Sequence, residues 1–117
     1  MAVKLHRRGF EQAKRLVSAG KVVLDERGDW SEHQPSAEQE NEFIRLHGIA
    51  EYGAWHLGID DSRPEMTKGH YKFPYGDFKD VHLCAVLSAE SRAGQYKHSD
   101  IQNAAAHLHG MLEAVKT

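Results

Sequence analysis

The chain has 117 residues, 40% hydrophobic and 27% charged, which predicts one globular domain over residues 1–117 and excludes a wholly disordered chain. Fifteen Lys and Arg against seventeen Asp and Glu give a formal net charge of −2, which disfavours nucleic acid as a partner. A single cysteine excludes an internal disulfide, and no apolar run suits a signal peptide or a membrane span, so a cytoplasmic location is expected.

The first part of the chain predicts two helices joined by a short extended segment. Residues 8–19 carry apolar side chains at helical spacing, and Gly20 is placed to end that helix. Residues 21–24 are short and β-branched, which indicates a small strand or an extended connector. A second helix is predicted after Ser36, which begins a capping box, and it should end at Gly48.

The middle of the chain predicts a small antiparallel hairpin with a wide loop. Towards the end of residues 49–59, large apolar side chains alternate with small or polar ones, as in a strand. Residues 71–73 are the expected partner strand, separated from the first by the polar residues 60–69. Pro74 cannot donate a ladder hydrogen bond, so the second strand should end there or lie at an edge.

The last third predicts two packed helices. Residues 78–95 are apolar in nearly every direction around a helix axis, so this helix, begun by Gly76 and Asp77, should lie at the centre of the protein. A stripe of alanines at 85, 89 and 93 would allow close approach of a final helix that begins near Ser99. The expected fold class is therefore α+β, with about four helices, one small antiparallel β-hairpin and a C-terminal αα-hairpin.

Two motifs carry a resemblance to other proteins. Trp-x-Leu-Gly-Ile-Asp at 55–60 and Tyr-Lys-Phe-Pro-Tyr-Gly-Asp at 71–77, with a third segment at 92–96, are similar to a family of small bacterial proteins of unknown function. The resemblance covers most of the chain and implies no particular activity. A shorter pattern, from Phe73 through Asp77 to Ala85, resembles helical segments of phage-associated proteins whose role is also unknown.

The leading functional hypothesis is a non-enzymatic binding or interaction module that uses the aromatic side chains of the hairpin. The predicted binding residues are Trp55, Tyr71 and Tyr75. Tyr71 and Tyr75 are expected to face outward, whereas Trp55 and Phe73 should pack against the core. A protein or a small ligand could occupy such a surface, and no cofactor is predicted.

The alternative hypothesis is a metal-dependent enzyme, prompted by nine histidines. The best candidate ligand set from the sequence is His56, Asp60, His70 and Asp77, because residues on neighbouring strands can approach closely enough for ligation. Ordinary structural roles would also explain these residues: His56 as a strand residue, Asp60 and His70 as loop residues, and Asp77 as a helix cap. Cys84 is expected to be a buried, unreactive thiol that diverges from His82 on the predicted helix.

Overall fold

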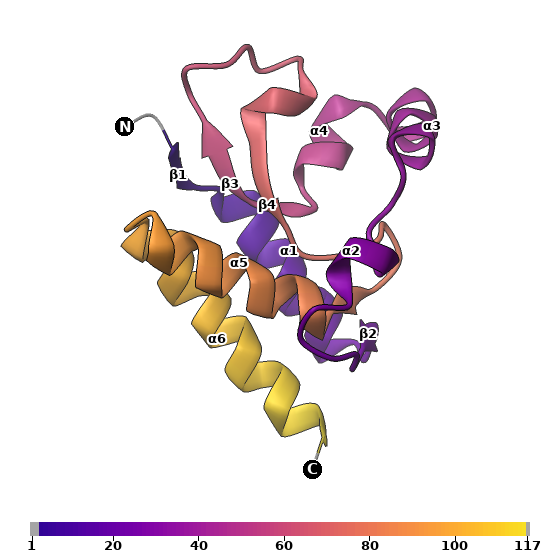
Figure 1. The fold of residues 1–117 in the computed structure, drawn as a ribbon. Coiled ribbons are helices and arrows are strands. Elements are labelled where there is room, and N and C mark those ends of the chain that lie inside the picture. Colours follow the sequence, from indigo (N-terminus) through magenta and orange to yellow (C-terminus); the bar gives the residue numbers. More distant parts are fainter. Residues whose placement is uncertain (1–2, 117) are drawn as a thin grey trace.

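A small antiparallel sheet lies against three long helices in this protein, whose computed structural model describes residues 3–116 (Figure 1). Helices α1, α5 and α6 pack beside one another below the sheet, and the shorter helices lie to one side. The elements in chain order are β1 (Val3–Leu5), α1 (Arg7–Ser18), β2 (Val22–Val23), α2 (Trp30–His33), α3 (Ala37–His47), α4 (Ile49–Gly53), β3 (His56–Asp60), the 3₁₀ turn η1 (Lys68–His70), β4 (Tyr71–Pro74), β5 (Val81–His82), α5 (Leu83–Gln95) and α6 (Ser99–Lys116).

The α+β prediction is confirmed, and the four predicted helices correspond to the four longest ones. Helix α1 ends before Gly20, which adopts a φ of +77° that favours glycine. Helix α3 begins with the predicted capping box, in which Ser36 accepts the Gln39 backbone N–H and Gln39 accepts that of Ser36. Helices α2 and α4, of four and five residues, are additional to the prediction.

The predicted hairpin is part of a three-stranded sheet with the order β1-β3-β4. Strand β4 pairs antiparallel with β3 and ends at Pro74, as predicted, whereas β1 on the other edge of β3 was missed. Residues 49–53 form helix α4 and not the start of a strand. Helix α1 crosses β3 so closely that a Cβ on Gly9 would lie 1.9 Å from the backbone oxygen of His56.

The helix predicted over residues 78–95 begins later, at Leu83. Before it, residues 76–81 form a tight turn in which Phe78 has a φ of +73°, a conformation that no helix accommodates. The chain then enters strand β5, which pairs in parallel with β2. Side chains from Asp77 to His82 therefore take the directions set by a turn and a strand, and not those of a helix.

Helices α5 and α6 form the predicted C-terminal αα-hairpin and run antiparallel, side by side (Figure 1). Their buried side chains complete one hydrophobic core whose largest fully buried members include Leu57, Tyr75, Ile101, Leu108 and Leu112. Among the described residues, no helix has the length and apolar character needed to cross a membrane.

Candidate metal centre

The parallel pair β2–β5 brings together two segments that are far apart in the sequence. Val22 lies opposite Val81 and Val23 opposite His82, so the carboxyl ends of both strands meet at one edge. Asp25 follows β2 at this edge, and helix α5 starts immediately after β5 there. This pairing places the Asp25 carboxylate against the last residue of β5 and the first turn of α5.

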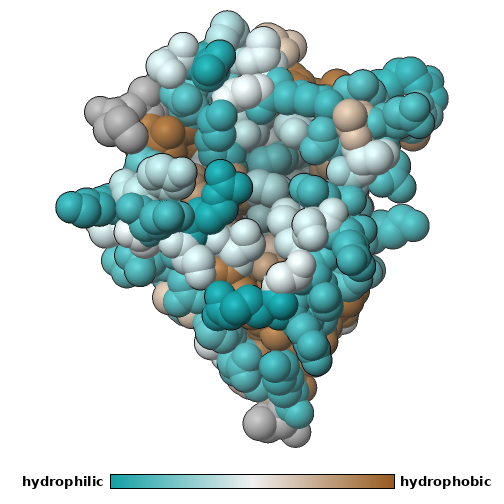
Figure 2. Space-filling view, viewed as in Figure 1, coloured by the Kyte–Doolittle hydropathy of each residue, from teal (hydrophilic) through white to brown (hydrophobic). Residues whose placement is uncertain are grey.

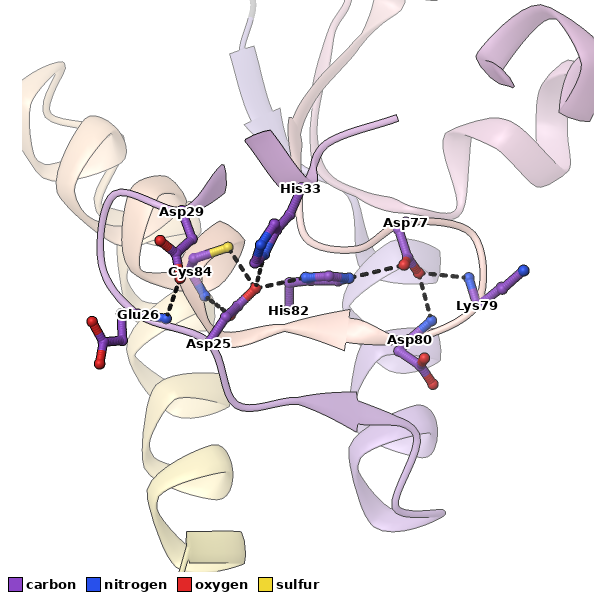
Figure 3. Close-up of polar contacts among 9 residues, drawn as sticks. All are labelled: Asp25, Glu26, Asp29, His33, Asp77, Lys79, Asp80, His82 and Cys84. Atoms are coloured by element: carbon purple, nitrogen blue, oxygen red, sulfur yellow. Dashed lines mark hydrogen bonds and ion pairs between the residues drawn. The ribbon is translucent and has the colours of Figure 1, made fainter. Parts of the chain in front are cut away.

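Four side chains converge at this edge, and three of them point at one carboxylate oxygen (Figure 3). Asp25 Oδ2 lies 2.8 Å from His33 Nδ1, 2.7 Å from His82 Nδ1 and 2.9 Å from Cys84 Sγ. One potential ligand atom from each of the four residues lies within 4.8 Å of the others. In residues 3–116 this is the one such group of three or more His, Cys, Asp or Glu side chains.

The group is buried except on one side. The side chains of Asp25 and His82 are 4% and 6% exposed and Cys84 is buried, whereas the His33 side chain is 38% exposed. His33 comes from the short helix α2, which follows a turn closed by a hydrogen bond from the Glu26 N–H to Asp29 Oδ2. Solvent and ions therefore reach the group from the His33 side.

The electrostatics of the group centre on a charged Asp25. Burial alone would raise the pKa of Asp25, but hydrogen bonds from the thiol and backbone N–H of Cys84, from His33 and from His82 hold it well below its usual value. The hydrogen bond to Asp25 raises the pKa of His33. Burial, together with donation to Asp25, raises the pKa of the Cys84 thiol. The cluster thus holds one carboxylate among groups that carry protons.

His82 lies between two carboxylates. Its Nδ1 faces Asp25, and its Nε2 lies 2.9 Å from Asp77 Oδ2. The second contact is at ion-pair distance but lacks the alignment of a hydrogen bond, so this buried nitrogen has no hydrogen bond within the described chain. Asp77 is fixed in turn, because its Oδ1 accepts the backbone N–H groups of Lys79 and Asp80. The ring orientation is consequently set from both sides.

These ligand types define the chemistry that the group can support. Two imidazoles, one thiol and one carboxylate are the donors that Zn²⁺ and similar transition-metal ions accept, and four donors complete a tetrahedral site. A histidine that binds a metal through one nitrogen usually presents its other N–H to a carboxylate. Asp77 stands where that partner belongs, behind His82 as seen from Asp25 (Figure 3).

The structure does not bring together the ligand set predicted from the sequence. His56 and His70 are both buried, and their Nδ1 atoms lie 3.0 Å from the backbone oxygens of Tyr52 and Arg63 respectively. The oxygen Oδ1 of Asp60 accepts hydrogen bonds from the next turn. Backbone groups thus engage both histidines, and of the predicted set only Asp77 lies at the observed cluster.

Of the orientations predicted for the binding aromatics, the buried position of Trp55 agrees with the structure and the outward position of Tyr75 is wrong. Tyr75 is fully buried, stacks on the buried Trp55 and donates a hydrogen bond from its hydroxyl to the backbone oxygen of Ala54 at 2.7 Å. Because Phe73 has a positive φ and the strand ends at Pro74, the direction of Tyr75 does not follow from that of Tyr71. Tyr71 is half-buried and lines a surface cavity, so it is the most accessible of the three predicted residues.

Sequence reasoning missed Asp25 and His33, which lie in a polar stretch for which no helix or strand was predicted, and it assigned diverging directions to His82 and Cys84. The prediction placed both residues on one helix, whereas His82 ends strand β5 and Cys84 lies in the first turn of α5, so the helical spacing does not apply to them. Comparison with protein families, curated proteins and solved structures finds no match to this chain. The resemblance to small bacterial proteins therefore stays a prediction. Any proposal about function has to be argued from the geometry of the structure.

Proposed function

We propose that this protein binds one divalent transition-metal ion between Asp25, His33, His82 and Cys84. The observation that carries the proposal is the convergence of four ligand side chains from three separate segments, three of them buried. Burying a carboxylate, an imidazole and a thiol together costs free energy that a bound ion would offset.

The donor set favours Zn²⁺ or a chemically similar ion over Mg²⁺ or Ca²⁺, because thiolate and imidazole ligands suit the former and oxygen ligands the latter. Four protein donors fill a tetrahedral coordination sphere, which is typical of structural sites; catalytic sites keep one position open. The proposed role is therefore to tie the segment 25–33 to β5 and α5. A structural ion fits the binding-module hypothesis better than the metal-dependent enzyme.

Ion binding changes the protonation of the cluster in a defined way. The Cys84 thiol must lose its proton to become a ligand, and the two imidazoles must present an unprotonated Nδ1. His82 then carries its proton on Nε2, facing the carboxylate of Asp77. Each ion bound releases at least the thiol proton, so metal affinity should fall on acidification.

Titration of chelator-stripped protein with Co²⁺ tests the proposal. We expect one ion per chain, visible absorption bands of a tetrahedral cobalt centre, and a near-ultraviolet band from sulfur-to-cobalt charge transfer. Zn²⁺ should then displace Co²⁺ and abolish both signals. Cys84→Ser should remove the charge-transfer band, and His33→Ala should weaken binding without disturbing a core residue.

Two variants act as matched controls. His47→Ala removes a histidine from the exposed end of α3, and Asp60→Asn alters the ligand set predicted from the sequence; both should bind Co²⁺ like the parent protein. Protein that takes up neither ion, or uptake that survives unchanged in both Cys84→Ser and His33→Ala, would overturn the proposal. In that case Asp25 would be a hydrogen-bonded charge and no ligand.

A further inference from the structure

A second site is suggested by a cavity of about 250 Å³ between strand β4 and helix α5. Its α5 side is made by Ala85 and Ala89, whose small side chains leave space beneath the hairpin. These are two of the three alanines predicted to admit a neighbouring helix, and here they border a cavity. On the face shown in Figure 2, the surface is hollowed between the hairpin and α5.

Two cations line this cavity outside the ion pairs of the described chain, although Lys72 acts at longer range on the carboxylate of Asp60. Lys72 from β4 and Arg92 from α5 both border it, and neither has a carboxylate within ion-pair distance in residues 3–116. The hydroxyl of Ser88 also borders it and makes no hydrogen bond to another described residue. Elsewhere in the described chain several surface cations are paired, including Lys4, Arg8 and Lys68. The cavity is therefore bordered by three residues whose side chains can donate hydrogen bonds to an oxyanion.

The wall of the cavity contains a strained backbone. Phe73 has a φ of +61°, which L residues with large side chains rarely adopt. The β3–β4 ladder pairs Gly58 with Lys72 and His56 with Pro74, but it skips Phe73 between them. The Phe73 ring instead makes an edge contact with His98 beside α6. Non-glycine residues held in this conformation gather at binding and catalytic sites, where the surrounding structure maintains them.

We propose that this cavity binds a small organic oxyanion, a phosphate monoester or a carboxylate with an apolar body. The oxyanion would receive hydrogen bonds from Lys72, Arg92 and Ser88, since a guanidinium fork and an ammonium group both suit phosphate and carboxylate oxygens. The apolar body would rest on Ala85 and Ala89. A neutral molecule of the same shape would leave both cations unpaired and bind weakly.

Nuclear magnetic resonance titration of the ¹⁵N-labelled chain with phenyl phosphate, benzoate, inorganic phosphate and benzyl alcohol tests this site. Saturable shifts confined to residues 71–74 and 85–92 are expected for phenyl phosphate, benzoate or both, and the preferred one identifies the oxyanion. Binding should weaken with added salt because the attraction is between charges. Benzyl alcohol should bind at least tenfold more weakly.

Variants separate the site from general attraction to cations. Lys72→Gln and Arg92→Gln should each weaken binding at least about tenfold, the loss of one charge-assisted hydrogen bond. Ala89→Leu should fill the cavity and abolish binding. Lys79→Gln and Arg7→Gln remove cations that do not line the cavity and should leave affinity unchanged. The amide spectra report whether each variant is folded.

Three results would overturn this inference: shifts scattered over the surface, equal binding of benzyl alcohol, or affinity unchanged in both Lys72→Gln and Arg92→Gln. The inference does not depend on the metal centre, because the titrations use protein without metal and none of the variants alters a proposed ligand. Failure of either proposal therefore leaves the other in place.

Discussion

Asp25 contacts Cys84 twice: Oδ1 accepts the Cys84 backbone N–H at 2.7 Å, and Oδ2 faces Sγ at 2.9 Å. The residue that precedes α5, His82, provides no side-chain cap, so a carboxylate 59 positions earlier in the chain satisfies a free N–H of the first turn. A negative charge at this helix end is also favourable for the helix dipole. One side chain therefore secures the start of the central helix.

Asp25→Ala should destabilise the protein even without metal. The change leaves His82, Cys84 and the first turn of α5 without their buried acceptor, and breaking such a network lowers the free energy of unfolding by about 3 kcal/mol. Chemical denaturation in the presence of a chelator measures the change. Asp29→Ala removes an acid that closes only a local exposed turn and should cost less than about 1 kcal/mol. Equal stability of the two variants would contradict this interpretation.

Mild acid should destabilise the fold through His56. Burial lowers the pKa of His56 to about 4, whereas the unfolded chain takes up this proton near pH 6.5. Because the depressed value belongs to a base, the stabilisation is complete above pH 6.5 and is lost as the pH falls towards 4, by about 3 kcal/mol in total.

The His56→Asn variant isolates this contribution. Asparagine keeps an N–H donor near the position of Nδ1, which lies 3.0 Å from the Tyr52 backbone oxygen, but it does not titrate. The free energy of unfolding, measured from pH 7 to pH 4.5, should fall less steeply in the variant than in the parent protein. Parallel slopes would show that His56 takes up its proton in the folded state as readily as in the unfolded chain.

Two glycine substitutions in helices should have opposite effects. Gly9→Ala introduces a methyl group where α1 meets the backbone of β3, and overpacking of this kind costs about 1 to 3 kcal/mol. Gly110→Ala in α6 meets nothing within 4 Å and should stabilise the protein by up to about 1 kcal/mol through helix propensity. Thermal melts of both variants measure the difference. Stabilisation by Gly9→Ala would mean that α1 lies farther from β3.

Tyr75→Phe should show that this tyrosine is part of the core. Its hydroxyl donates to the backbone oxygen of Ala54 and lies 3.1 Å from Gln12 Nε2, so removing it should cost about 1 kcal/mol. Tyr71→Phe removes the hydroxyl of the half-buried neighbour and should change stability by less than about 0.5 kcal/mol. Denaturation midpoints of the two variants decide the question. An unchanged denaturation midpoint in Tyr75→Phe would indicate that Tyr75 lies at the surface.

The elements with strong local signals were predictable from the sequence. The capping box at Ser36, the glycine after α1 and the apolar stripe of α6 are all determined by residues within a few positions of each other. Strands β1, β2 and β5 have only two or three residues and exist because of partners about 55 to 60 positions away, which no local pattern encodes.

The candidate site depends on those unpredictable strands. Asp25 and His33 lie in a polar stretch with the composition of a turn, and only the parallel pairing of β2 with β5 brings them to His82 and Cys84. The histidines that the sequence favoured, at 56 and 70, lie beside backbone carbonyl oxygens that only the tertiary structure places there. The number of histidines therefore indicated a possible metal site. Which residues form the site could be told only from the way the strands pair.

The pairing of β2 with β5 also has a kinetic consequence. We expect residues 25 and 84, which are 59 positions apart, to meet late in folding, because closing so long a loop early costs chain entropy that few contacts repay. Contacts that form after the transition state affect the unfolding rate and leave the folding rate almost unchanged. We therefore expect an ion bound at this edge to lengthen the lifetime of the folded chain without speeding its formation.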